Sequence, residues 1–120
     1  MRYMLPIYNN PATHEAFSQE ERDELFGEVD RIINERTESG EWVGGEGLAD
    51  ASTAKTVRFR GDVPAVTDGP FVEGKERLAG YCIVDCETID RAVEIAADWP
   101  DAKHFAMEVR ALMSGSEPAM

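Results

Sequence analysis

A sharp turn leads into an apolar run in Val66-Thr-Asp-Gly-Pro-Phe-Val-Glu-Gly-Lys-Glu-Arg-Leu-Ala-Gly-Tyr81. The turn is Asp68-Gly69-Pro70, because aspartate can hydrogen-bond its own backbone, glycine accepts a positive φ, and proline fixes φ without offering an N–H. Residues 78–84 are nearly all apolar, which is typical of a strand buried on both faces at the centre of a sheet. We therefore expect the bend to place an acidic side chain at the end of a buried strand, where a site can form.

The segments before the turn predict two strands separated by a long helix. Residues 2–8 alternate as a strand, in which Pro6 is awkward because proline cannot donate to a sheet ladder. Ser18 and Glu21 form a capping box, which predicts a helix from Ser18 to Ser39 that Gly40 stops. Residues 42–48 predict a second strand, whose three glycines indicate a bulge or a close approach to a partner chain or a ligand.

The remaining segments predict a hairpin, a second helix and a last strand. Residues 56–60 and 65–67 form the hairpin, which closes at Gly61-Asp62 and delivers the chain to the turn. The second helix begins after Thr88 and ends at Trp99-Pro100. Its residues expected to point inward are Ile89, Ala92, Val93 and Ala96. Residues 104–112 alternate as the last strand.

This order of elements is a split βαβ pattern, which predicts one α+β domain over residues 1–113 and a short flexible C-terminal tail at 114–120. Two helices can cover only one face of an antiparallel sheet. The other face must meet water or the sheet of a second copy, which would pair two chains into a barrel-like dimer.

The charge and hydrophobicity of the chain argue against several classes of function. The 120 residues carry 24 acids against 12 Lys and Arg, and a net charge of −12 argues against binding nucleic acid or anionic membranes. No apolar run approaches the roughly 20 residues of a membrane span, and the N-terminus lacks a signal-peptide core, so we expect a cytoplasmic protein. Cys82 and Cys86 lie roughly 13 Å apart in a strand with a rise of about 3.3 Å per residue, so buried free thiols are expected.

Several motifs occur in a characteristic order along residues 1–113. They are Arg2 to Tyr8, Val43 to Leu48, Asp68-Gly69-Pro70-Phe71, Glu73-x-Lys75-Glu76-x-x-x-Gly80-Tyr81 and Glu108-Val109-Arg110. Together they resemble the DGPF group of bacterial YCII-related proteins. The resemblance implies a ferredoxin-like α+β fold, an antiparallel sheet with two helices on one face, and a homodimer of the dimeric α+β barrel type.

Asp68 is the first candidate catalytic residue. It would act as a general base or as an acceptor for a bound small molecule, tuned by partial burial; the alternative is a turn-former that accepts from backbone N–H groups near Phe71. Carboxylates gathered at one cleft would raise one pKa and so supply an acid and a base. The candidates to join Asp68, each with a surface role as its alternative, are Glu46, Glu73 and Glu76.

Two further residues are candidate ligand contacts. Lys75 can neutralise a carboxylate or bind an anion, and otherwise makes a surface ion pair. Tyr81 lies in the predicted buried strand, where its hydroxyl needs a hydrogen-bond partner. It is either a core tyrosine or a phenol donor in a pocket, and the same two alternatives apply to Tyr3 and Tyr8.

Histidine and metal chemistry have weaker signals. The broader YCII group is associated with a His–Asp pair whose histidine lies early in the first helix. Residues 18–39, the predicted first helix here, contain no histidine. The two histidines of the chain are His14, upstream of that helix, and His104, at the start of the predicted last strand. No C-x-x-C pair, histidine cluster, P-loop or G-x-S-x-G is present, so neither a metal site nor a cofactor is expected.

Two functions from different classes remain open. The first is a domain that binds a small molecule in a pocket near Asp68. The resemblance implies an example of its activity, a lyase-like elimination on a small aromatic compound without a cofactor. The second is a non-catalytic regulatory protein. DGPF proteins are linked with extracytoplasmic-function sigma factors, which would contact the acidic first helix.

Overall fold

The computed structural model describes residues 1–72 and 74–113; the predicted tail at 114–120 lies outside these ranges. Within them, no helix is long and apolar enough to cross a membrane. In chain order the elements are β1 (Arg2–Asn9), α1 (Pro11–Glu15), α2 (Gln19–Glu38), β2 (Trp42–Gly47), a 3-10 turn (Ala51–Thr53), β3 (Lys55–Arg60), β4 (Val63–Asp68), β5 (Arg77–Asp85), α3 (Ile89–Asp98), α4 (Pro100–His104), β6 (Ala106–Met107) and β7 (Arg110–Ala111).

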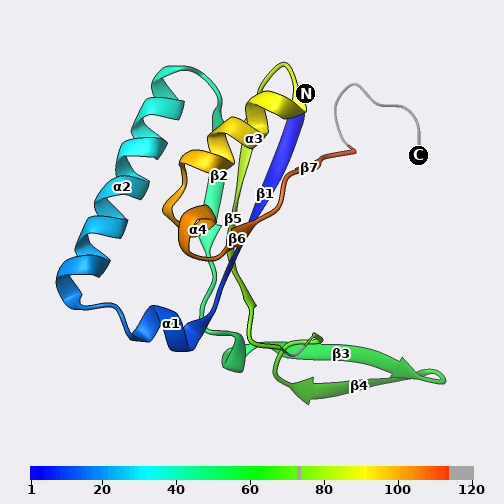
Figure 1. Ribbon diagram of the computed structural model, residues 1–120. Helices are drawn as coiled ribbons and strands as arrows, with labels where there is room; N and C mark the ends of the chain where they lie inside the picture. Colours follow the sequence, from blue (N-terminus) through cyan, green and yellow to red (C-terminus); the bar gives the residue numbers. More distant parts are fainter. Residues whose placement is uncertain (73, 114–120) are drawn as a thin grey trace.

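An antiparallel sheet forms the centre of the fold (Figure 1). Its strands run in the order β2-β5-β1-β6, and β7 also pairs with β1. Within the residues that the structure describes, strands β3 and β4 pair only with each other and form a separate hairpin, as the alternation predicted. The architecture confirms the predicted α+β class and is compatible with a ferredoxin-like fold.

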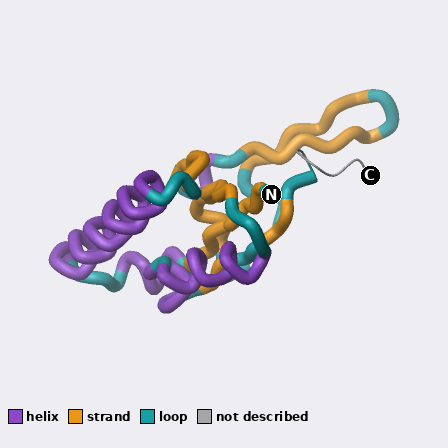
Figure 2. The backbone as a smooth tube through the Cα atoms, turned by 90° about the horizontal axis from the view of Figure 1, so that it is seen from above, coloured by secondary structure: helices purple, strands orange, loops and turns teal. Residues whose placement is uncertain are grey.

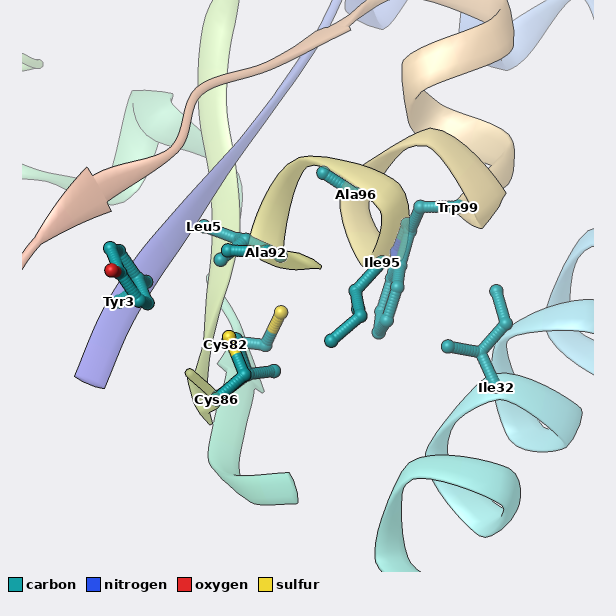
Figure 3. Close-up of a cluster of buried hydrophobic side chains, with 10 residues drawn as sticks. Tyr3, Leu5, Ile32, Cys82, Cys86, Ala92, Ile95, Ala96 and Trp99 are labelled. Atoms are coloured by element: carbon teal, nitrogen blue, oxygen red, sulfur yellow. The ribbon is translucent and has the colours of Figure 1, made fainter. Parts of the chain in front are cut away.

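The core lies between the sheet and the helices (Figure 3). Leu5 of β1 lies in one buried cluster with Ile32 of α2 and Ile95 of α3. Val84 of β5 is fully buried in the same cluster. Other buried side chains in the same cluster are Tyr3, Cys82, Cys86, Ala92, Ala96 and Trp99. The two cysteines are free and buried, as predicted, and burial raises the pKa of Cys82 to about 12. One face of the sheet thus holds the whole core.

The opposite face of the sheet is less buried than the apolar run at residues 78–84 predicted. In β5, Cys82 and Val84 are buried, but Tyr81 and Ile83, which point the other way, are only half-buried. The prediction that this strand is buried on both faces is therefore wrong for the single chain, because the helices cover one face and leave the other open.

The helix boundaries follow local capping chemistry. Ser18 accepts from the N–H of Glu21 while the Glu21 carboxylate accepts from the N–H of Ser18, which confirms the predicted capping box at the start of α2. Gly40 ends this helix region with φ 82°. The short helix α1 was not predicted; Asn10 caps it by accepting from Ala12 N at 3.1 Å.

Helix α3 begins after Thr88 as predicted, but its inward stripe differs. Ala92 and Ala96 are buried together with Ile95, whereas Ile89 and Val93 are each 49% exposed. Helical geometry explains the correction, because positions 92, 95, 96 and 99 share one side of a 3.6-residue helix and that side faces the sheet.

The predicted last strand at residues 104–112 is wrong in its extent. His104 ends helix α4, and the strand that follows is divided into β6 and β7. The gap lies beside Pro6 of β1, whose oxygen accepts from Glu108 N at 3.1 Å but which has no N–H to return. The proline therefore interrupts the ladder between β1 and the last strand.

Two glycines allow β2 to lie close against β5. A Cβ on Gly45 would stand 2.7 Å from the carbonyl oxygen of Tyr81, and one on Gly80 would stand 2.7 Å from the oxygen of Glu46. The ladder also shifts register between Trp42 and Gly44, which confirms the predicted bulge. The close approach is made to the neighbouring strand of the same chain.

We expect Gly45→Ala to lower the free energy of unfolding by about 1–3 kcal/mol, because the added methyl group meets backbone atoms of β5. Gly44→Ala is the matched control, since nothing lies within 4 Å of the methyl position there. Urea unfolding of both variants measures the difference. Equal stability of the two would contradict the close approach.

Glu41 ties the turn after α2 to helix α3. Its carboxylate accepts from Arg91 Nε at 2.8 Å and Arg91 Nη2 at 3.0 Å, from Arg36 Nη1 at 3.1 Å and from Ser39 Oγ at 2.8 Å. The hydrogen bonds from Arg91, the largest cause, lower the pKa of Glu41 from 4.5 to about 2. The charged form of Glu41 therefore stabilises the folded chain.

Because the folded chain holds this pKa below its ordinary value, the contribution of Glu41 is complete above pH 4.5 and is lost as the pH falls toward 2. We expect Glu41→Gln to cost about 1–3 kcal/mol at neutral pH and progressively less below pH 4.5. Glu94→Gln is the control, because Glu94 pairs with the same arginine but is 67% exposed. A pH-independent loss in Glu41→Gln would refute the assignment.

Candidate functional site

The predicted turn at Asp68 is held by hydrogen bonds to Ala54, which precedes β3, and to Thr56 of β3. Gly69 adopts φ 95°, and its N–H donates to Ala54 O at 2.8 Å. The hydroxyl of Thr56 donates to the oxygen of Gly69 at 2.7 Å. These contacts anchor the base of the β3–β4 hairpin and set the direction in which the chain continues past Pro70.

Asp68 is the last residue of β4, and its side chain is 83% exposed. The carboxylate forms an ion pair with the ammonium group of Lys55, its partner in the ladder. In the single chain Asp68 thus faces solvent at the hairpin base. Its catalytic role stays a prediction.

The other candidates occupy separate places. Glu46 lies opposite Tyr81 in the β2–β5 ladder, so these two side chains share the open face of the sheet. Lys75 and Glu76 are exposed in the segment between the turn and β5. Glu73 lies outside the described residues. The structure therefore brings Glu46 and Tyr81 together and leaves Asp68 with Lys55.

A cavity of about 580 Å³ opens where β2 ends and β5 begins. The segment after the Asp68 turn forms one wall, and the loop between β2 and β3 forms another. The lining residues are Tyr8, Leu48, Ala49, Asp50, Ala51, Thr53, Ala54, Pro70, Val72, Glu76, Arg77 and Leu78. A concave, largely apolar surface with a few polar groups is the usual form of a small-molecule site.

Arg77 is the cation of this cavity. Its Nη1 is shielded from solvent and has no hydrogen-bond partner among residues 1–72 and 74–113. Arg77 also lines an adjoining cavity of about 190 Å³, together with His14 and Asp50. A buried donor without a partner costs about 1–3 kcal/mol, and in the described part of the chain Arg22 Nε and Arg36 Nε are in the same state.

Tyr8 and Asp50 have shifted pKa values at the wall. A hydrogen bond with Glu108 raises the pKa of Tyr8, and burial and the charge of Glu108 add to this. The phenol therefore keeps its proton at neutral pH. Hydrogen bonding from Ser52 lowers the pKa of Asp50, with a smaller contribution from the charge of Arg77, so this carboxylate is ionised.

The family model of the YCII-related domain matches residues 1–114. The chain belongs to the YCII-related family. It is similar to "Uncharacterized protein R00369" of Rhizobium meliloti (strain 1021), with 30% identity over 102 residues, which is 85% of this chain and 82% of the relative. The resemblance inferred from the ordered motifs is confirmed.

The histidines of this YCII-related protein lie away from Asp68. His14 belongs to α1 and His104 ends α4, and both line a cavity of about 100 Å³ with Asp101. Burial raises the pKa of Asp101, and the charges of His14 and His104 oppose this. The ring of Phe17 lies edge-on to His104, with centroids 5.4 Å apart. Across the described ranges, no three His, Cys, Asp or Glu side chains are grouped as a metal site.

Sequence reasoning did not single out the two polar residues that distinguish the large cavity of this YCII-related chain. Arg77 counted only as one charge in a charged loop, and Tyr8 only as one of three tyrosines that need a hydroxyl partner. A usable signal was present for Arg77, because it is the last charge before the apolar run and therefore enters the sheet.

Proposed function

We propose that this YCII-related protein binds a small organic anion in the cavity beside the Asp68-Gly69-Pro70 turn. The observation that carries the proposal is the guanidinium of Arg77, the one cation among the described residues that line the cavity. Guanidinium groups recognise carboxylates through charge-assisted hydrogen bonds that are stronger than neutral ones. An acid group bound in the cavity would pair with this positive charge.

The rest of the lining sets the class of ligand. Leu48, Val72 and Leu78 present apolar surface, which favours a ligand with an aliphatic or aromatic body. Asp50 and Glu76 place negative charge at the same wall, which disfavours a second acid group on the ligand. The best fit is a monoanion of small size, since 580 Å³ lies within the usual range for such sites, about 300–1,000 Å³.

Acid–base chemistry without a cofactor is the proposed activity. Tyr8 keeps its proton beside the Glu108 carboxylate, so the pair supplies a donor and a potential acceptor of that proton. Asp68 precedes Gly69, whose N–H donates to the oxygen of the wall residue Ala54, which supports a place for its carboxylate near the cavity. A lyase-like proton transfer on a bound aromatic acid fits these positions, with Asp68 as the proposed base.

The proposed working unit is a homodimer formed through the open face of the sheet. Tyr81 and Ile83 of β5 are half-buried there without a covering layer, and Met4 of β1 lies opposite Ile83. Glu46 and Tyr81 would then lie at the subunit interface, where these two predicted ligand contacts can form. Packing of two sheets buries such faces in sandwiches and barrels.

A non-catalytic role is the second candidate. Helix α2 carries eight acids and three arginines over 20 residues, and its acidic side chains are exposed. This surface suits a basic protein partner, of which an extracytoplasmic-function sigma factor is the proposed example.

We expect benzoate, used as the probe, to bind the cavity and Arg77→Gln to weaken its binding at least tenfold, since the charged donor pair is lost. Amide chemical shifts during titration measure the affinity and locate it, with changes expected at Tyr8, Ala51 and Leu78. Arg60→Gln is the control, because Arg60 is exposed on the hairpin and does not line this cavity.

Benzamide tests the charge, because it has the same ring without the carboxylate and should bind at least tenfold more weakly. Equal binding of benzoate to wild type and Arg77→Gln, or the absence of shifts around the cavity, would refute the proposed site. Absence of any binding would favour the non-catalytic role instead.

A further inference from the structure

Two cavities meet at one wall beside the start of β5. The large cavity of about 580 Å³ and the smaller one of about 190 Å³ share the loop residues 48–51 and the first two residues of β5, Arg77 and Leu78. Helix α1 borders the smaller cavity through His14 and Glu15. A ligand held at the shared wall can therefore reach both spaces.

The two cavities differ in the chemistry of their walls. Most of the wall surface of the large cavity is apolar, and its own residues include Pro70 and Val72. Most of the wall surface of the smaller cavity is polar, and its own residues include Asn9, His14 and Glu15. The large cavity thus suits the apolar body of a ligand, and the smaller one suits a polar or charged group.

Carboxylates outnumber cations around the shared wall. Among the described lining residues of the two cavities the carboxylates are Glu15, Asp50 and Glu76, and Arg77 is the one lysine or arginine. A ligand whose only charge is a carboxylate would be attracted by Arg77 and repelled by these three acids. A positive group on the same ligand would convert this repulsion into attraction.

Asp50 is the acid best placed to receive a positive group. It lines both cavities, as Arg77 does. Hydrogen bonding from Ser52 lowers the pKa of Asp50, and the charge of Arg77 adds to this, so an ionised carboxylate and a guanidinium act on each other at the shared wall. Ser52 occupies Asp50 Oδ2, and an ionised carboxylate has further acceptor positions for an ammonium group.

We infer that the site binds an α-amino acid with a large apolar side chain. The inference rests on the proposed anion site and names the class of its ligand. An α-amino acid carries a carboxylate and an ammonium group on one carbon atom, so the first pairs with Arg77 while the second pairs with Asp50. Its side chain occupies the large cavity beside Val72 and Leu78.

An amine without an acid group is the alternative that three carboxylates would permit. Arg77 disfavours it, because an ammonium group at the shared wall would face the guanidinium with no carboxylate of its own to offset the repulsion. The combination of one cation with several acids therefore favours a ligand that carries both charges.

Three probes with the same phenyl ring separate the two charges. L-phenylalanine has both charged groups, 3-phenylpropanoate lacks the ammonium group, and 2-phenylethylamine lacks the carboxylate. In isothermal titration calorimetry of the wild-type chain, we expect L-phenylalanine to bind at least about fivefold more tightly than either of the others, since each of these lacks one charge-assisted pair.

Asp50→Asn removes the charge assigned to the ammonium group and keeps an oxygen for Ser52. We expect it to reduce the preference for L-phenylalanine over 3-phenylpropanoate to less than about twofold, because the ammonium group loses its charged partner. The variant is expected to bind 3-phenylpropanoate as tightly as wild type or more tightly, since one repelling acid is gone.

Asp62→Asn is the matched control and should keep the full preference for L-phenylalanine. Asp62 lies between β3 and β4 at the tip of the hairpin, which projects from the body (Figures 1 and 2), and it lines neither cavity.

Equal binding of L-phenylalanine and 3-phenylpropanoate by the wild-type chain would overturn the inference and leave the anion site intact. A preference that is unchanged in Asp50→Asn would also overturn it, because the ammonium group would then not pair with Asp50. If the wild-type chain binds none of the three probes, the inference fails, and the benzoate titration decides whether the anion site stands. The comparison of probes needs only the wild-type chain, so it holds even if Asp50→Asn does not fold.

Discussion

The absence of side chains at Gly45 and Gly80 is the constraint on which the structure depends. It lets β2 approach β5 so closely that a methyl group at either glycine would collide with a carbonyl oxygen of the neighbouring strand. The bulge near Gly44 then takes up the extra residue. Because β2 ends at Gly47, just where β5 begins, the loops that leave these strands diverge there and form the walls of the large cavity.

The chain uses its few cations in two different ways. Arg91 is paired with Glu41 and links α3 to the turn before β2, so its charge stabilises the fold. Arg77 stands at the start of the central strand with one N–H shielded and unpaired. Its charge acts on Asp50, and it is the one cation among the described residues that line the large cavity. That contrast makes Arg77, rather than the more exposed Lys75, the main anchor of the proposed ligand.

The family match shows that the chain is a YCII-related domain. The geometry of the cavity supports the proposal that this domain binds a small organic anion. The turn at Asp68 was recognised from its residues because Asp-Gly-Pro has strong local preferences. The cavity beside the turn was not, since its walls come from β1, the loop after β2 and the start of β5. Asp68 itself lies on the hairpin with Lys55, and its proposed catalytic role depends on what covers the hairpin.

The sequence alone determined the features that depend on nearby residues. The capping box at Ser18, the cap at Thr88, the glycine bulge in β2 and the hairpin are all local, and each was predictable within a residue or two. Only the tertiary structure decided the break between β6 and β7, the buried stripe of α3 and the place of Arg77 in the cavity wall. These depend on which distant strand or helix lies alongside, and the periodicity of a single segment does not contain that information.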